Sequence, residues 1–205
     1  MNHLFAYVLC LLAWQGAMLE RKPGEAAEAF VLRQFEEEQR QEILELHPII
    51  EYAWGDTEKG KKILCFIPAK YSASGMMQAK VFLPQRKNTY QIALIDKILF
   101  TGGGEPEQVI TVFFEDIDAN GDKELLFIKK ASIKDYKDLI HKDGSVWKNA
   151  PYRRQVYSTF IYRQRKSGKE YLPAFEAITW PYLMDRLQGL QTASEVRQVI
   201  QKLRD

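Results

Sequence analysis

The sequence has few of the residues that build zinc sites, disulfides and nucleophilic active sites. Its 205 residues include two cysteines and three histidines, and no Cys-x-x-Cys, His-x-x-x-His or Gly-x-Ser-x-Gly pattern occurs. Zinc coordination and a nucleophile elbow therefore have no support. The glycines at 102–104 are not followed by Gly-Lys-Ser or Gly-Lys-Thr. We read them as a loop, not as a phosphate-binding motif.

The beginning of the chain lacks charged side chains. Residues 4–14 are all apolar, the small residues Gly16 and Ala17 follow, and the first charge after them is Glu20. This order resembles a secretory signal peptide, and the apolar run is too short to cross a bilayer comfortably. We expect residues 1–17 to be a signal peptide and the protein to be exported, to the periplasm or outside the cell. A retained membrane anchor or a buried helix is the alternative.

Removal of that segment would leave a single cysteine. Cys10 would be lost, and Cys65 lies in the apolar run 63–67. We expect a buried thiol that behaves as a small hydrophobic side chain and not as a nucleophile. With no intramolecular disulfide, an exported domain must take its stability from its core or from a bound ion.

Charge is unevenly distributed although the net charge is only +2. Acidic residues predominate over positions 20–58, and basic residues over positions 129–169. We expect these charges to be solvated or to attract each other across the fold. The alternative is a basic surface for an anionic partner, because residues 152–166 mix aromatic and basic side chains. On a strand the arginines would face water, so nucleic acid is not the expected partner.

Hydrophobic patterns predict a fold of mixed class. Helix-forming residues with apolar side chains at spacings of three and four predict one helix over 25–46, ended by Pro48. A similar stripe predicts a C-terminal helix that Thr192 or Ser194 caps. Between them, short alternating segments and turn residues predict strands. We expect a single α+β domain over 18–205, with an antiparallel sheet of about six to eight strands and a helix at each end.

The segment 116–125 predicts a metal site. Oxygen-bearing side chains occur at alternate positions, Asp116, Asp118, Asn120 and, after Gly121, Glu124. Ca²⁺ takes six to eight oxygen ligands, whereas Mg²⁺ keeps more of its water. Five carboxylates within ten residues would repel one another without a cation. The alternative is a solvated hairpin tip, because Asn-Gly also favours a tight β-turn.

This segment is not an EF-hand, since Phe127 stands where the twelfth-position Glu belongs and both flanks are strand-like. It resembles the Asp-x-Asp/Asn-x-Asp-Gly loops of FG-GAP or VCBS repeats, the blades of integrin-type propellers. The resemblance implies a structural Ca²⁺ held by the side chains of Asp116, Asp118, Asn120 and Glu124 and by the carbonyl of Asp122. The sequence departs from the pattern with Asn at the fifth place and Glu at the ninth. Only one copy occurs, so a propeller is not implied.

The sequence thus predicts an exported, calcium-stabilised and non-catalytic binding module whose partner is a protein or a glycan. The alternatives are a secreted or periplasmic hydrolase with an unrecognised site, and a scaffold that retains one integrin-like loop. Neither the particular partner nor the oligomeric state follows from the sequence.

Overall fold

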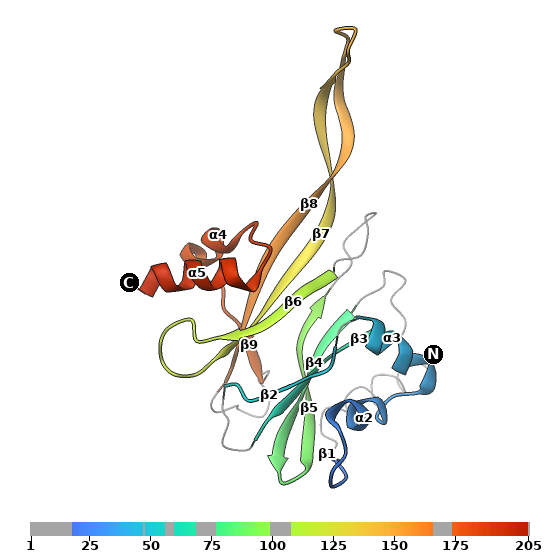
Figure 1. The fold of residues 1–205 in the computed structure, drawn as a ribbon, viewed down its shortest axis with the longest axis vertical. Helices are drawn as coiled ribbons and strands as arrows, with labels where there is room; N and C mark the ends of the chain where they lie inside the picture. Colours follow the sequence, from blue (N-terminus) through green and yellow to red (C-terminus); the bar gives the residue numbers. More distant parts are fainter. Residues whose placement is uncertain are drawn as a thin grey trace, which may run out of the picture.

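The computed structural model describes residues 18–46, 48–55, 60–68, 77–98, 108–165 and 174–204. These ranges contain two antiparallel sheets, with helices near both ends of the chain (Figure 1). The predicted α+β class is confirmed, although the strands form two sheets and not one. The predicted signal peptide, the glycine loop at 102–104 and a predicted turn at 166–169 lie outside the described residues.

The first sheet has the strand order β1-β5-β4-β3-β2 and the second has the order β6-β7-β8-β9. The strands of the first sheet are β1 (Met18–Glu20), β2 (Ile50–Tyr52), β3 (Lys62–Pro68), β4 (Met77–Arg86) and β5 (Thr89–Ile98). Those of the second are β6 (Gln108–Glu115), β7 (Glu124–Ile140), β8 (Val146–Gln164) and β9 (Phe175–Ala177). The helices are α2 (Ala27–Leu32), α3 (Glu37–Leu46), α4 (Pro181–Leu187) and α5 (Ala193–Arg204).

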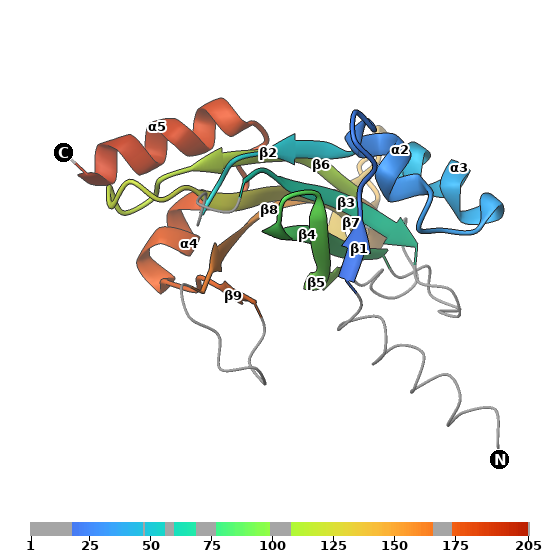
Figure 2. The ribbon, with the colours of Figure 1, turned by 90° about the horizontal axis from the view of Figure 1, so that it is seen from below.

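Three apolar clusters hold these elements in layers. The first lies between the two sheets and includes Phe66 of β3 and Phe127 of β7, whose rings meet edge to face at 5.4 Å. The second lies between the first sheet and helices α2 and α3, and the third between the second sheet and helices α4 and α5. Both sheets are therefore covered on two faces, with α4 and α5 on one side of the molecule and α2 and α3 on the other (Figures 1 and 2).

The alternation of side chains along a strand explains this layering. Leu64 and Phe66 of β3 face the second sheet, while Ile63, Cys65 and Ile67 face helices α2 and α3. Strands that are buried on both faces read as continuous apolar runs. Cys65 is buried and free, as predicted, and burial raises the pKa of its thiol to about 12.

The N-terminal helical region differs from the single helix predicted. α2 ends at Leu32 and α3 begins at Glu37, with buried Phe35 between them. The side chain of Arg40 donates to the backbone carbonyls of Leu32 and Phe35, at 2.9 and 3.0 Å. Carbonyls at a helix end need partners. Arg40 donates to both carbonyls, and the Leu32 carbonyl also accepts from the backbone N–H of Phe35, so the chain turns with these groups paired.

The C-terminal helix is capped as predicted at one of the two candidate residues. Thr192 Oγ1 accepts a hydrogen bond from the backbone N–H of Glu195, and the Glu195 carboxylate accepts one from the N–H of Thr192. This reciprocal arrangement is a capping box. It fixes the start of α5, which lays Val196 and Ile200 on the second sheet.

The strands β7 and β8 form an arm that the sequence did not predict. β6 pairs with β7 only as far as Lys130, and β9 pairs with β8 only over 162–164. Among the described strands, residues 131–156, called the arm below, therefore pair only with each other, and they project beyond the other described elements (Figure 1). A two-stranded ribbon has little apolar surface to bury. The alternation that marks core strands is consequently weak in this part of the sequence.

Candidate metal centre

The acidic loop connects β6 to β7 at the end opposite the arm. The pair Glu115–Glu124 closes the two strands, and the loop between them turns through positive φ at Ala119 and at Gly121, where φ is +89°. Glycine adopts such a conformation without steric cost, whereas other residues are strained there. The sequence therefore places its glycine where the backbone reverses, as predicted.

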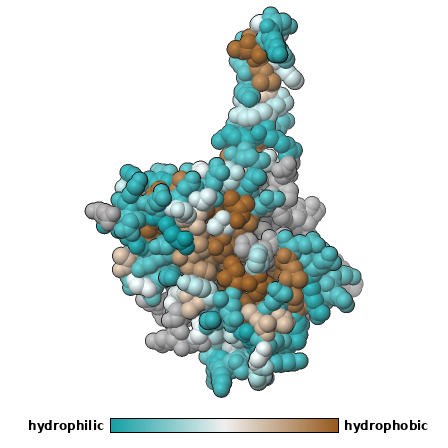
Figure 3. Space-filling model, in the orientation of Figure 1, coloured by the Kyte–Doolittle hydropathy of each residue, from teal (hydrophilic) through white to brown (hydrophobic). Residues whose placement is uncertain are grey.

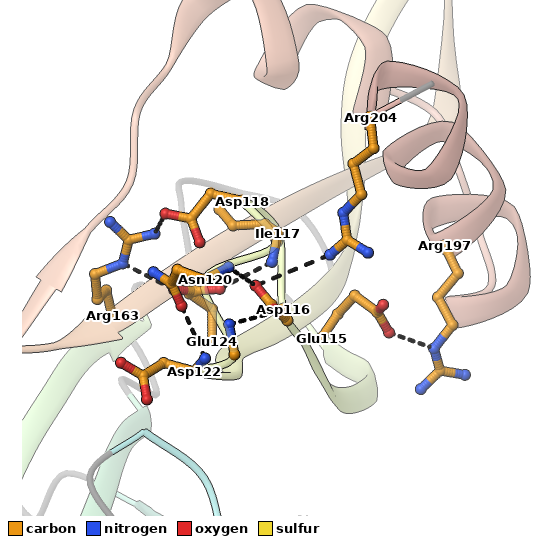
Figure 4. Close-up of polar contacts among 11 residues, drawn as sticks. Glu115, Asp116, Ile117, Asp118, Asn120, Asp122, Glu124, Arg163, Arg197 and Arg204 are labelled. Atoms are coloured by element: carbon orange, nitrogen blue, oxygen red, sulfur yellow. Dashed lines mark hydrogen bonds and ion pairs between the residues drawn. The ribbon is translucent and has the colours of Figure 1, made fainter.

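Hydrogen bonds within the loop fix the positions of its acidic side chains. Asp116 accepts from the backbone N–H of Asn120 at 3.1 Å and of Gly121 at 2.8 Å (Figure 4). Glu124 accepts from the N–H of Ile117 at 3.0 Å. Charge-assisted bonds of this kind are stronger than neutral ones. They hold the two carboxylates inside the turn instead of letting them point to solvent.

Three of the predicted ligand residues come together. Asp116, Asp118 and Glu124 each offer one carboxylate oxygen, and these atoms lie within 4.8 Å of one another. Because Ca–O distances are about 2.3–2.6 Å, two ligands on opposite sides of one ion are about 4.6–5.2 Å apart. The acidic triad of Asp116, Asp118 and Glu124 therefore has a spacing that could hold a metal ion.

The other two predicted ligands are placed differently. Asn120 turns its amide oxygen to the backbone N–H of Asp122, at 2.8 Å, and so braces the loop. The Asp122 carboxylate points away from the triad in Figure 4; the sequence had assigned its carbonyl, not its side chain, to the ion. The full five-residue ligand set stays a prediction.

Arg163, near the end of β8, is a member of the site that sequence reasoning missed. Its Nη2 lies 2.6 Å from Asp118 and its Nε lies 2.8 Å from Glu124. The expectation that the arginines of this segment face water is therefore wrong for Arg163. Burial lowers the pKa of Arg163, but the hydrogen bonds and charges of Glu124 and Asp118 outweigh this effect and raise it.

Two arginines of α5 add to the positive charge around the loop. Arg204 lies 4.0 Å from Asp116, and Arg197 lies 3.1 Å from Glu115 (Figure 4). Arg163 and Arg204 together offset two of the three negative charges of the triad. One negative charge remains, and a carboxylate group has about four lone-pair sites. The triad, with its arginine contacts in place, could thus still hold a metal ion.

The far end of the loop is tied to the first sheet. The backbone N–H of Gly55 donates to the carbonyl of Lys123 at 3.2 Å, and Lys123 Nζ lies 3.0 Å from the hydroxyl of Tyr52. Tyr52 in turn stacks on Phe114 of β6, with ring centroids 4.6 Å apart. The loop therefore joins both sheets and α5, which makes it a structural junction.

Sequence signals for the missed arginines were weak. Arg163, Arg197 and Arg204 are 39 to 88 positions from their carboxylate partners, as the sequence numbers show. Of these three arginines, only Arg163 lies in the segment 129–169, where basic residues predominate. Arg163 follows Tyr162, a buried core residue. Because side chains alternate along a strand, this order indicated that Arg163 points to the opposite face of the sheet.

Comparisons with protein families, with curated proteins and with solved structures found no match for this chain. The likeness to integrin-type calcium loops therefore depends on residues 116–125 alone. What the fold and the site define is a class: an α+β protein of two antiparallel sheets, with an acidic triad that could hold a metal ion. Among the described residues, none belongs to a helix that is long and apolar enough to span a membrane.

Proposed function

We propose that the protein is an exported, non-catalytic binding module in which a calcium ion at the acidic triad stabilises the strand pair β7–β8 at the end opposite the arm. The observation that carries this proposal is the position of the triad. Glu124 is the first residue of β7, and its partner Arg163 is next to last in β8. An ion at this point would stabilise the strand pair from which the arm extends.

Calcium fits the donor set better than the other common metals. All three triad side chains supply hard carboxylate oxygens, which suit Ca²⁺ and Mg²⁺ and not Zn²⁺ or Cu²⁺. Mg²⁺ demands a near-ideal octahedron at about 2.0–2.1 Å. The backbone bonds to Asp116 and Glu124 keep these carboxylates from contracting freely around so small an ion.

A binding role is supported by the shape and the surface of the arm. Tyr136, Ile140 and Val146 are 54%, 77% and 51% exposed, and apolar atoms gather near the top of the arm in Figure 3. Large apolar side chains gathered on a projecting element mark an interaction site more often than scattered ones do. Cys65 offers no support for a catalytic role as a nucleophile, because its thiol is buried and stays protonated at neutral pH.

Thermal unfolding with calcium, with magnesium and with EDTA tests the calcium site. At ten times its dissociation constant, the ion would add about 1.4 kcal/mol of stability. For a chain of this size, that corresponds to a rise in Tm of about 3–6 °C. We expect calcium to raise the Tm of the wild type and to have little effect on Asp118→Asn.

The matched control is Asp122→Asn, which makes the same chemical change in the same loop and keeps the backbone carbonyl. It should retain the calcium response of the wild type. A melting curve that is the same in calcium and in EDTA would rule out the site. A response that Asp118→Asn retains would place the ion elsewhere.

A further inference from the structure

Two surfaces of opposite charge are exposed in the part of the chain that the structure describes. The arm, residues 131–156, carries six basic and three acidic residues, and α3 carries four acidic residues and one basic residue. The formal charges are therefore +3 and −3. The one base of α3, Arg40, donates to the backbone carbonyls of Leu32 and Phe35. This contact leaves the exposed face of α3 to its glutamates.

The basic surface of the arm destabilises the arm when no partner covers it, because its positive charges repel one another. Lys134 and Arg153 are directly paired across the two strands of the arm, and both are exposed. Like charges at opposed positions of a sheet destabilise the pair. Lys134 contacts the ring of Tyr136, with 5.5 Å to the centroid. Within the described residues, no carboxylate pairs with either base.

The face of the arm that carries Lys134 also carries exposed apolar residues. Tyr136, Asp138 and Ile140 alternate with Lys134 along β7, so the four share a face. The cross-strand partners on that face are Pro151 and Val146. The opposite face is internally paired, because Asp135 contacts both Arg154 and Tyr152 there. Trp147, which is 57% exposed, lies on that opposite face too, so the two faces differ in their unpaired bases and not in apolar exposure.

The acidic surface is also unfavourable on its own. Glu38, Glu42 and Glu45 are spaced by four and three residues, which places them on one side of α3. Like charges at this spacing destabilise a helix. Glu38 and Glu42 have no cationic partner among the residues that the structure describes. Leu44, which is 43% exposed, lies on another side of α3, four residues after Arg40, while Ile43 packs against the first sheet.

We propose that the arm of one chain docks on α3 of a second copy, with Lys134 and Arg153 against Glu38 and Glu42. One chain cannot make this contact by itself, because its arm projects away from its own α3 (Figure 1). Two copies related by a twofold axis make the contact twice. Such a closed, self-complementary arrangement is the commonest symmetry of homo-oligomers.

The surface of the arm fits a protein partner better than a lipid bilayer. The turn at its end, His141–Ser145, contains Lys142 and Asp143, and its apolar residues lie behind this polar tip. Insertion of the tip into a bilayer would carry both charges into the hydrocarbon region, which is costly. A helix that presents carboxylates can pair with Lys134 and Arg153 without moving either charge into hydrocarbon.

Charge reversal on each surface gives a direct test by sedimentation equilibrium of the full chain. The arm variant is Lys134→Glu with Arg153→Glu, and the helix variant is Glu38→Lys with Glu42→Lys. We expect the wild type to dimerise, and more weakly as salt is added. Each variant alone should dimerise at least about tenfold more weakly, because like charges then face each other at both contacts.

An equimolar mixture of the two variants should restore dimerisation. In the mixed dimer, the reversed arm meets the reversed helix, and the native arm meets the native helix. The control variant, Lys87→Glu with Lys202→Glu, changes the net charge as the arm variant does but lies elsewhere, and it should dimerise like the wild type. Circular dichroism verifies that every variant is folded.

A wild type that stays monomeric would overturn the proposal, and so would a mixture that fails to associate while the wild type dimerises. Binding of a monomer to anionic vesicles would assign the arm to a membrane surface instead. The inference relies on the proposed function only in treating the arm as the binding element. A monomer whose Tm still rises with calcium would refute the second copy and leave the calcium site standing.

Discussion

The guanidinium group of Arg163 lies 2.8 Å from the carboxylate of Glu124, which is only 1% exposed. This ion pair joins the end of β8 to the start of β7. It is the most buried charge contact in the acidic loop, and the same arginine also reaches Asp118. Arg163 therefore stabilises the loop in the absence of an ion, and its positive charge opposes the binding of one.

The first prediction concerns Arg163→Met. Removal of the guanidinium leaves a buried carboxylate without its cation, and this should cost about 2–3 kcal/mol in EDTA. The value is below that for a fully buried pair, because Arg163 is partly exposed. The triad becomes more negative, so calcium should raise the Tm of this variant more than that of the wild type.

Arg165→Met is the control, since Arg165 pairs with Glu176 at a more exposed position. It should cost no more than about 1 kcal/mol and leave the calcium response unchanged. Thermal unfolding in EDTA and in calcium measures both quantities. An Arg163→Met variant as stable as the wild type in EDTA would contradict the role assigned to this ion pair.

Gly121→Ala tests the turn of the loop. Gly121 has φ +89°, and an added Cβ would meet no atom within 4 Å, so the cost comes from the backbone alone. A left-handed conformation costs a residue with a Cβ about 1–2 kcal/mol. Because the backbone N–H of Gly121 holds Asp116 in place, we expect calcium to bind more weakly as well.

Gly144→Ala provides a matched comparison. Gly144 has φ +84°, equally open surroundings, and a place in the turn of the arm. It should bring a similar local strain without any change in calcium affinity. Calcium titrations followed by thermal unfolding distinguish the two variants. Equal calcium affinities in both would show that the conformation of Gly121 does not shape the site.

The free energy of unfolding at acid pH should depend on Glu25. Hydrogen bonds from Arg33 lower the pKa of Glu25 from 4.5 to about 2. A carboxylate whose pKa is lowered on folding stabilises the protein above its unfolded pKa, and this contribution is lost as pH falls through the folded value. Stability that depends on Glu25 should therefore disappear between about pH 4.5 and pH 2.

The variant Glu25→Gln should be less stable than the wild type at neutral pH, and the difference should shrink as the pH falls toward 2, where protonation of Glu25 sets in. Urea unfolding at a series of pH values measures this convergence. A constant difference between the two proteins down to pH 2 would mean that the pKa of Glu25 is not lowered in the folded state.

Cys65 should be unreactive in the native protein. Its thiol is buried, and a pKa of about 12 leaves almost no thiolate at pH 8. We expect alkylation of Cys65 to require unfolding, with a rate that rises with urea. Mass mapping of the modified peptide separates Cys65 from Cys10, and Cys65→Ala serves as the blank. Rapid native labelling of Cys65 would place it at an accessible position.

Much of the fold was predictable because its signals are local. The apolar runs of β3 and β7 and the capping box of Thr192 and Glu195 are set by residues close together in the sequence. The triad was predictable for the same reason, since Asp116, Asp118 and Glu124 lie within one loop. Gln39 had interrupted the apolar stripe over 25–46, but only the structure shows that the helix divides before it.

Other features depend on distant parts of the chain and could not be predicted in this way. Arg163 reaches the loop because β8 pairs with β7 over the whole length of β7. The arm escaped prediction because its strands bury few apolar residues, and hydrophobic periodicity is the main signal for a strand. β1 pairs with β5 and so occupies the edge of β5 that a later strand could otherwise use, and the strands divide into two sheets. No local pattern in the sequence specifies this pairing.

The most direct test of the central claim is an NMR titration of the full chain with calcium, observing the backbone amides of the acidic loop. The amides of Ile117, Asn120 and Gly121 donate to the triad carboxylates, so their resonances should move along one saturable curve. The affinity should fall in the range of extracellular calcium modules, with Kd about 10⁻⁴–10⁻³ M. Loop amides that do not shift at calcium concentrations well above that range would contradict the claim.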